Sequence, residues 1–155
     1  MYKTILLPHA GSPAGDDALE HAIHIAKSDS AKIIILHVLE DLPIVPLMLH
    51  QAQIEHIKQQ MAEVTETLKK TMESEMVKRI KLCEKNKIKA ELKVTTGIPA
   101  DEILKIVKNQ RIDLIVMAKR KKLKGIKKLL MLGSVSRKIL EHVSCPVLMI
   151  DIEKK

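Results

Sequence analysis

The stretch KIIILHV, at residues 32–38, decides the fold. It is a short, nearly continuous apolar run rich in β-branched residues, which is the pattern of a strand covered on both faces. Residues 3–8 (KTILLP), 112–118 (IDLIVMA) and 145–150 (CPVLMI) have the same character. Residues 88–95 (IKAELKVT) instead alternate apolar and polar positions, which predicts an outer strand.

Four stretches of helical character lie between these strands, at residues 14–28, about 50–86, 100–109 and 134–143. The longest of them carries apolar residues at steps of three or four, which form a stripe along one side of a helix. Such a stripe normally packs onto a sheet, and we expect it to do so in this protein. The second interpretation is that the stripe forms a groove for a partner helix. The stripe consists of Ile54, Ile57, Met61, Val64, Leu68, Met72, Met76 and Ile80.

Strands and helices thus alternate along the chain with short connections, which is typical of parallel strands joined by right-handed crossovers. The sequence therefore predicts an α/β fold: a single domain over residues 1–155, with an open, doubly wound, parallel five-stranded sheet and helices on both faces. The one irregular connection, residues 39–49 with Pro43 and Pro46, indicates a surface excursion. In such a sheet, ligands bind beyond the carboxyl ends of the strands, where the strand order reverses.

The composition favours one compact core and excludes several classes of protein. Of the 155 residues 46% are apolar, and a chain of this length removes roughly 70% of its unfolded surface from water without disulfides or metal. Cys83 and Cys145 form no C-x-x-C pair, so two thiols in a reducing compartment are expected. No apolar run approaches the roughly 20 residues that span a bilayer, and we expect a cytoplasmic protein without membrane contact. His21 and His24 share a helix face without an acidic or cysteine ligand at a metal-site spacing, so no metal site is expected.

The positive charge is concentrated in one segment. The chain has 27 Lys and Arg against 19 Asp and Glu, and seven of the cations lie within residues 119–128, leaving 20 cations elsewhere. Such a segment could attract phosphate, nucleic acid or an acidic partner, and the alternative is a solvated lysine-rich loop. Tyr2 is the only aromatic residue. Stacking platforms for single-stranded nucleic acid are therefore missing, and no sequence-specific nucleic acid binding is expected.

Several separated motifs resemble those of universal stress proteins, in the same order and over essentially the whole chain. The resemblance implies a Rossmann-like fold of the adenine nucleotide alpha hydrolase-like type. The matching stretches are ILLP at residues 5–8, Gly11-Ser12, LHV at 36–38, GIP at 97–99, DLIVM at 113–117, LGSVS at 132–136 and CPVL at 145–148.

The resemblance also implies a candidate site, because some members of the family bind ATP. In those members an Asp stands two residues after the first-strand Pro, and a glycine-rich loop after the fourth strand wraps the phosphates. Here Ala10 stands in place of the Asp, while Ala118 and Lys121 stand in place of two loop glycines. The candidate ligand-contacting residues are Pro8, His9, Ala10, Val38, Met117, Ala118, Lys121, Gly133, Ser134, Val135, Ser136 and Arg137.

The missing glycines predict weak binding. Glycine permits positive φ and close approach of backbone amides to an anion, which Ala or Lys usually cannot reproduce. The stretch from Gly133 to Arg137 still opens a helix whose free amides and dipole favour an anion, with Ser134 as the N-cap. The lysines of residues 119–128 could replace amides by point charges. Two interpretations stay open: a phosphate ligand binds here, or Ser134 only caps its own helix.

The sequence contains no evident catalytic constellation. A hydrolase or phosphotransferase needs a positioned base or a metal-holding carboxylate, and the loops after the first and fourth strands contain no Asp or Glu before Asp16. His9 could act as a base, but a histidine at this position is more often a polar loop residue. His37 lies in an apolar strand and is expected to be a buried, hydrogen-bonded imidazole. We therefore expect a regulatory protein of the universal stress type, without turnover.

Two functions are open, and they differ in the ligand. The first is weak binding of ATP or AMP, with magnesium only through the bound nucleotide. The second is a homodimer that has lost nucleotide binding and acts as a structural or interaction protein, with residues 119–128 contacting polyanions or acidic partners. In both cases the apolar last strand, Pro146 to Ile150, is expected to pair with a second copy, because an edge strand has unpaired amides. The family resemblance also implies a two-fold dimer.

Overall fold

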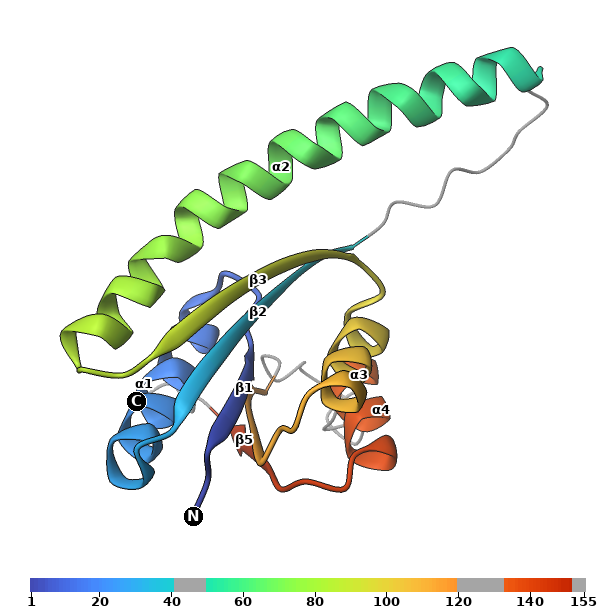
Figure 1. Cartoon of the computed structure of the whole chain (residues 1–155). Coiled ribbons are helices and arrows are strands. Elements are labelled where there is room, and N and C mark those ends of the chain that lie inside the picture. The colour runs from blue at the N-terminus through green and yellow to red at the C-terminus, as the bar shows by residue number, and fades with distance from the viewer. Residues whose placement is uncertain (41–49, 120–132, 152–155) are drawn as a thin grey trace, which may run out of the picture.

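The computed structural model describes residues 1–40, 50–119 and 133–151. Five strands in these ranges form one parallel sheet: β1 (Thr4–Pro8), β2 (Lys32–Glu40), β3 (Ala90–Gly97), β4 (Leu114–Ala118) and β5 (Val147–Ile150). Their order in the sheet is β3-β2-β1-β4-β5 (Figure 1). The predicted α/β fold is confirmed, and the alternating segment forms the edge strand β3. Residues 41–49, which make up most of the predicted excursion, lie outside the described part of the chain.

Within the described residues, four helices cover the two faces of the sheet: α1 (Pro13–Asp29), α2 (Gln51–Lys85), α3 (Pro99–Asn109) and α4 (Ser134–His142). Helix α1 begins where Ser12 accepts a hydrogen bond from the amide of Gly15, with Pro13 as the first helical residue. Helices α1 and α2 contribute to the core on one face, and α3 and α4 to the core on the other. The doubly wound arrangement is visible in Figure 1.

The alternation of side chains along the central strands divides the core. Ile33 and Ile35 of β2 pack on the side of α1 and α2, while Ile34 and Leu36 pack on the side of α3 and α4. All four are at most 1% exposed, which explains why this strand reads as an uninterrupted apolar run. Within the described residues, no helix has both the length and the apolar character needed to cross a bilayer.

The expectation that the whole stripe of α2 packs onto the sheet is wrong for its first half. Met76 and Cys83 are fully buried in the core, but Val64 is 58% and Leu68 is 51% exposed. The N-terminal part of α2 extends past the carboxyl end of β2 and away from the sheet (Figure 1). The sheet is too short to cover a helix of 35 residues, so the second half of the stripe packs in the core, whereas Val64 and Leu68 remain exposed.

Candidate functional site

The strand order reverses between β1 and β4. Strand β1 pairs with β2 on one side and with β4 on the other, with Leu6 opposite Ile115. The helix that follows β1, α1, lies on one face of the sheet, whereas the helix that follows β4, α4, lies on the other. The carboxyl ends of β1 and β4 therefore lie at the switch point, where open α/β sheets bind their ligands.

The predicted site residues are distributed over three neighbouring strand ends and the start of α4. Pro8 ends β1 and is half-buried, and the exposed Ala10 follows it. Met117 is buried and Ala118 half-buried at the end of β4. Val38 lies two residues past the β2 residue that pairs with Pro8, and packs on the side of α3 and α4. Lys121 lies outside the described residues.

Gly133 is the N-cap of α4, so the prediction that Ser134 caps this helix is wrong. Ser134 is already the first helical residue and is exposed, and the amide of Arg137 donates to the carbonyl of Gly133 at 3.0 Å. No side chain caps α4 in the described part of the chain. The amides of Ser134, Val135 and Ser136 thus start a helix whose N-terminus can accept an anion.

His9 is buried, contrary to the expectation of a polar loop residue. Its side chain is fully shielded from solvent. Its Nδ1 accepts a hydrogen bond from the amide of Gly11 at 2.9 Å, and its Nε2 donates to Asp16 at 3.1 Å. These partners require the neutral tautomer that carries its proton on Nε2. His9 is therefore used to hold the loop after β1 against α1, and its ring is not free to contact a ligand.

His37 is the buried, hydrogen-bonded imidazole that the sequence predicts. It is 6% exposed, and its Nδ1 donates to the carbonyl oxygen of His9 at 2.8 Å. The amide of His9 donates in turn to the carbonyl of Leu36 at 2.8 Å. The two histidines thereby connect the loop after β1 to β2.

Arg79 of α2 completes this network, and sequence reasoning did not single it out. Its guanidinium donates from Nε and Nη2 to the two carboxylate oxygens of Asp16, at 2.8 and 3.2 Å. Its Nη1 donates to the carbonyl of Glu75 at 3.1 Å. The bidentate contact fastens α2 to α1, sixty-three positions apart in the sequence. An arginine in the middle of an otherwise apolar helix face was the available signal.

Burial lowers the pKa of His9, and charged partners lower that of Asp16. Burial, followed by the charge of Arg79, lowers the pKa of His9 from its ordinary 6.5, against the opposing effect of Asp16. Burial alone would raise the pKa of Asp16, but the hydrogen bonds and charges of Arg79 and His9 together lower it from 3.8. Asp16 is therefore ionised and His9 neutral near pH 7.

Thr95 is a further residue at this site that sequence reasoning missed. It pairs with Val38 across β2 and β3, and therefore faces the same side of the sheet as Val38. Its hydroxyl is buried and has no hydrogen-bond partner in the described part of the structure. A buried polar atom without a partner costs free energy and calls for an explanation, such as a ligand that completes its hydrogen bonding.

Comparison with known proteins establishes the family. The profile described as the universal stress protein family matches residues 1–151. The chain belongs to the universal stress protein family. Universal stress protein MJ0531 of Methanocaldococcus jannaschii is 31% identical over 155 residues, covering 100% of this chain and 85% of that protein. Universal stress protein YxiE of Bacillus subtilis is 31% identical over 160 residues, covering 97% of this chain and 99% of the other.

Solved structures of universal stress proteins share this fold. The structure of protein MJ0577 of Methanocaldococcus jannaschii superposes with a TM-score of 0.80 at 26% identity, over 100% of this chain and 99% of the other. A universal stress protein in complex with cAMP superposes with a TM-score of 0.68 at 18% identity, over 97% of both chains. Membership of the family thus rests on sequence and fold together.

Metal ligands do not gather in the part of the chain that the structure describes: no three His, Cys, Asp or Glu side chains lie where they could hold an ion together. Cys83 is buried and Cys145 half-buried, and neither forms a disulfide, in agreement with the sequence. Lys119, the first residue of the basic segment, pairs with Asp151 at 2.9 Å. The remainder of that segment, residues 120–128, lies outside the described residues.

Proposed function

We propose that this universal stress protein is a cytoplasmic regulatory protein that binds an adenine nucleotide, or a similar phosphate ligand, without turning it over. The observation that carries the proposal is the switch point between β1 and β4, together with the N-terminus of α4, which follows β4 in the chain and has no side-chain cap among the described residues. Two solved structures of the same fold support it, one with cAMP and one, from Arabidopsis thaliana, with AMP.

The two ends of the nucleotide would use different parts of this edge. Val38 and the unpaired hydroxyl of Thr95 would contact the base or the sugar, beside Pro8 and Met117. The first-turn amides of α4, from Ser134 to Ser136, would receive the phosphates, with Arg137 exposed on the next turn. Magnesium would enter only with the nucleotide, through its phosphate oxygens.

Weak binding follows from the residues that replace the Asp and the phosphate-binding glycines of the family. The side chain of Ala10 cannot accept a hydrogen bond from the ligand, and Ala118 carries a Cβ where a glycine would allow close approach. We expect dissociation constants for ATP and AMP of roughly 0.1–1 mM, equivalent to about −5.5 to −4 kcal/mol.

Replacing Thr95 with Val tests the base-binding part of the proposal. The substitution keeps the shape and removes the hydroxyl, so it should weaken AMP binding by about 2–10-fold, the worth of one neutral hydrogen bond. It should leave the stability unchanged or slightly higher, because the hydroxyl is unpaired in the described structure. Isothermal titration calorimetry at millimolar AMP measures the first effect, and urea unfolding the second.

Thr96→Val is the matched control. Thr96 is the next residue of β3, is exposed, and faces the opposite side of the sheet, so its replacement should not change AMP affinity. Ala10→Asp should strengthen binding. Equal affinities for the Thr95 and Thr96 variants would remove Thr95 from the site, and micromolar affinity of the unchanged protein would contradict the weak-binding argument.

A structural role as a homodimer is the second candidate function, and the position of β5 favours it. This strand is an edge of the sheet, pairs only with β4 in the described structure, and exposes 36% of Leu148. An edge strand of this kind can pair with a second copy through its free backbone groups. In that role, residues 119–128 would contact polyanions or acidic partners through charge alone.

Leu148→Lys tests the association through β5. A charge on the exposed face of the strand should lower the weight-average mass measured by light scattering at tens of micromolar protein, because pairing would bury the ammonium group. Lys93→Leu on the opposite edge strand, β3, is a control that should not lower the mass. An unchanged mass for Leu148→Lys would show that β5 is not the contact.

A further inference from the structure

Helix α2 carries two apolar stripes that face in different directions. The residues from Met72 onward turn toward the sheet: Met72 lies against Gly11, and Met76 and Cys83 are buried in the core. The earlier apolar residues are Ile54, Ile57, Met61, Val64 and Leu68. At 3.6 residues per turn, the centre of this earlier set is rotated by roughly 70–80° around the helix from the set that packs on the sheet.

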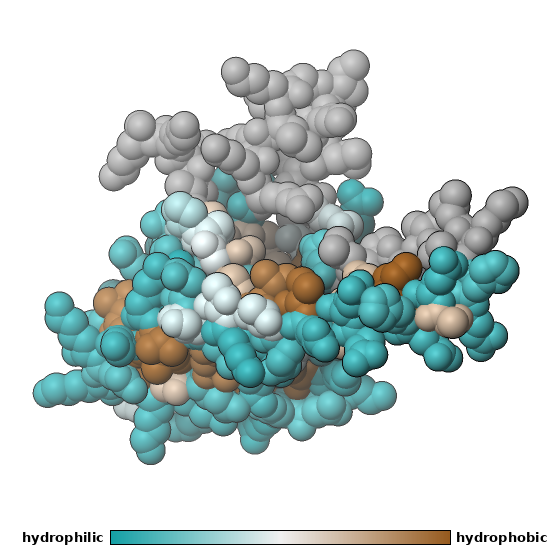
Figure 2. Space-filling model, turned by 90° about the horizontal axis from the view of Figure 1, so that it is seen from above, coloured by the Kyte–Doolittle hydropathy of each residue, from teal (hydrophilic) through white to brown (hydrophobic). Residues whose placement is uncertain are grey.

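The last two residues of the earlier stripe are open to solvent, and its first three are partly covered. Val64 and Leu68 are 58% and 51% exposed, and Ile54, Ile57 and Met61 are half-buried. Figure 2 looks down on the molecule from the side of α2 and shows hydrophobic atoms open to view among hydrophilic ones. Exposed apolar side chains that line up along one helix mark an interaction surface more often than scattered ones do.

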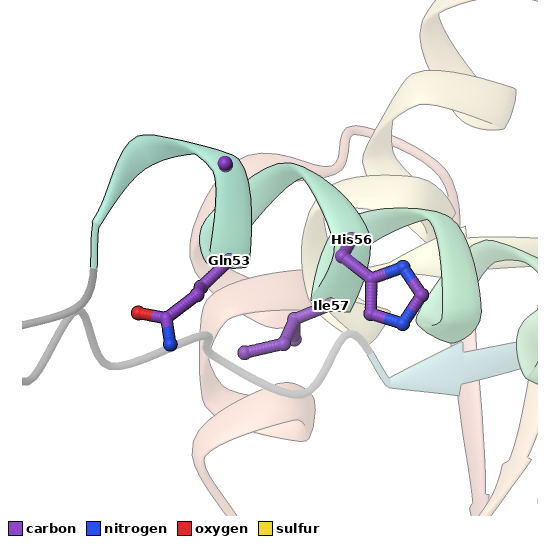
Figure 3. Close-up of a pocket in the computed structure, with 4 residues that line it drawn as sticks. Gln53, His56 and Ile57 are labelled. Atoms are coloured by element: carbon purple, nitrogen blue, oxygen red, sulfur yellow. The ribbon is translucent and has the colours of Figure 1, made fainter.

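Two shallow depressions lie along one flank of this stripe. The first, of about 390 Å³, is lined by Ala52, Gln53, His56 and Ile57, and Figure 3 shows Gln53 and Ile57 projecting to the same side of α2. The second, of about 330 Å³, is lined by Glu63, Val64, Thr67 and Leu68. They lie eleven residues apart, which is close to three helical turns, so both open on nearly the same side of the helix. Side chains from a second helix could enter both.

The spacing of the stripe is that of a coiled-coil seam. From Ile54 to Leu68 the steps are three, four, three and four residues, which is the alternation of positions a and d in a heptad. From Leu68 to Met76 the steps change to four and four, and the seam ends where contact with the sheet begins. The first half of α2 therefore has the pattern of a helix that pairs with another helix.

The residues that flank the seam favour a second copy of this chain as that helix. In an antiparallel two-fold pair each flank meets the same flank of the second copy, so a flank of one charge would repel itself. Here the flanking positions are occupied by Gln53, Gln60 and Thr67 on one side and by Lys58 and Thr65 on the other. Only one of these five residues is charged.

An antiparallel arrangement suits the shape of the molecule. In each copy the rest of the protein packs against α2 from Met72 onward. A parallel pair of α2 helices would bring the sheets of the two copies together at one end of the pair, whereas an antiparallel pair places them at opposite ends. With Met61 opposite Val64 of the second copy, Ile57 lies opposite Leu68 and the overlap covers residues 54–71. This overlap stops one residue before Met72. On the flank, Lys58 then meets an uncharged residue, Thr65.

We propose that residues 54–68 of α2 pair in antiparallel orientation with the same residues of a second copy of this chain. This contact is separate from the association through β5, because the two surfaces lie on different elements. It gives the protruding half of α2 a partner, which the described part of the chain does not supply.

Disulfide formation between two single variants tests the contact and its orientation. A mixture of Met61→Cys and Val64→Cys proteins should form a cross-linked dimer under mild oxidation, because these positions face each other only across an antiparallel pair. Each variant alone should form much less. The native thiols compete poorly: burial raises the pKa of Cys83 to about 11 and also raises that of Cys145. Leu148→Lys in both chains should leave the cross-link intact, which separates this contact from β5.

Charged variants provide an independent measurement. Val64→Glu with Leu68→Glu should abolish the α2 contact and lower the mass in sedimentation, without loss of helicity, because both side chains are exposed. The matched control is Val77→Glu with Leu82→Glu, which changes two exposed apolar residues of the same helix outside the stripe, 40% and 38% exposed. Cross-linking in each single variant but not preferentially in the mixture would overturn the antiparallel arrangement. Equal masses for the two charged pairs, or no cross-link in any sample, would overturn the contact itself.

Discussion

Gly15→Ala should destabilise the protein by about 1–3 kcal/mol, which is the cost of overpacking a buried site. The same substitution in an ordinary helix stabilises by up to about 1 kcal/mol, because alanine has the higher helix propensity. Here a Cβ on Gly15 would lie 2.7 to 2.9 Å from three ring atoms of His9. That ring is held from both nitrogens and cannot move without losing hydrogen bonds to Gly11 and Asp16. Urea unfolding measures the difference.

A double-mutant cycle separates this clash from other effects of Gly15→Ala. His9→Ala removes the ring, and in that background Gly15→Ala should be neutral or stabilising. The coupling free energy between the two positions should therefore be nearly as large as the destabilisation that the clash causes. If Gly15→Ala stabilises the protein that carries His9, the imidazole ring does not lie against Gly15.

Arg79→Met should destabilise the protein by about 2–3 kcal/mol. Removing one partner of a fully buried pair costs roughly 3–5 kcal/mol, since the remaining charge has no compensation. Asp16 is 47% exposed, so water can solvate part of its charge and the cost is smaller. Methionine keeps much of the apolar stem of Arg79, which limits the change to the bidentate contact with Asp16 and the hydrogen bond to Glu75. The same unfolding experiment gives the value.

Lys78→Met is the matched control for Arg79→Met. Lys78 is the neighbouring residue on α2 and pairs with Glu75 at 3.1 Å, but both side chains are largely exposed. Surface pairs of this kind contribute about 0–1 kcal/mol, so the control should change stability by less than Arg79→Met does. Similar losses for the two variants would contradict a special role for the Arg79 pair.

The pH dependence adds a second readout for Arg79. Because the pKa of Asp16 is lowered in the folded state, ionised Asp16 contributes to the free energy of unfolding above pH 3.8. This contribution is lost as the pH falls through the lower pKa of the folded state. Arg79→Met removes the main group that lowers this pKa. The difference in stability between the variant and the unchanged protein should therefore shrink in acid below pH 3.8, and a difference independent of pH would point to packing instead.

The fold could be predicted because strand burial leaves a direct trace in the residue pattern. Residues 33–36 have to be apolar on both sides, since helices cover both faces of the sheet there, and β3 alternates because it lies at an edge. The candidate ligand edge could also be located, because parallel strands joined by crossovers place their carboxyl ends together. The expected departure of the loop after β4 from the family's glycine pattern stays a prediction, because residues 120–132 lie outside the described part of the chain.

The sequence by itself determined the order and type of the elements and the family, and it predicted which edge of the sheet is the candidate ligand edge. Only the tertiary structure decided that His9 turns inward onto Asp16, that Arg79 reaches them from α2, and that Thr95 lies beside Val38. The physical reason is range: periodicity reports which side of an element is buried, whereas a hydrogen bond between α1 and α2 joins side chains sixty-three positions apart. The sequence also could not show that the first half of α2 extends beyond the sheet, because an apolar stripe looks the same whether its partner belongs to this chain or to another.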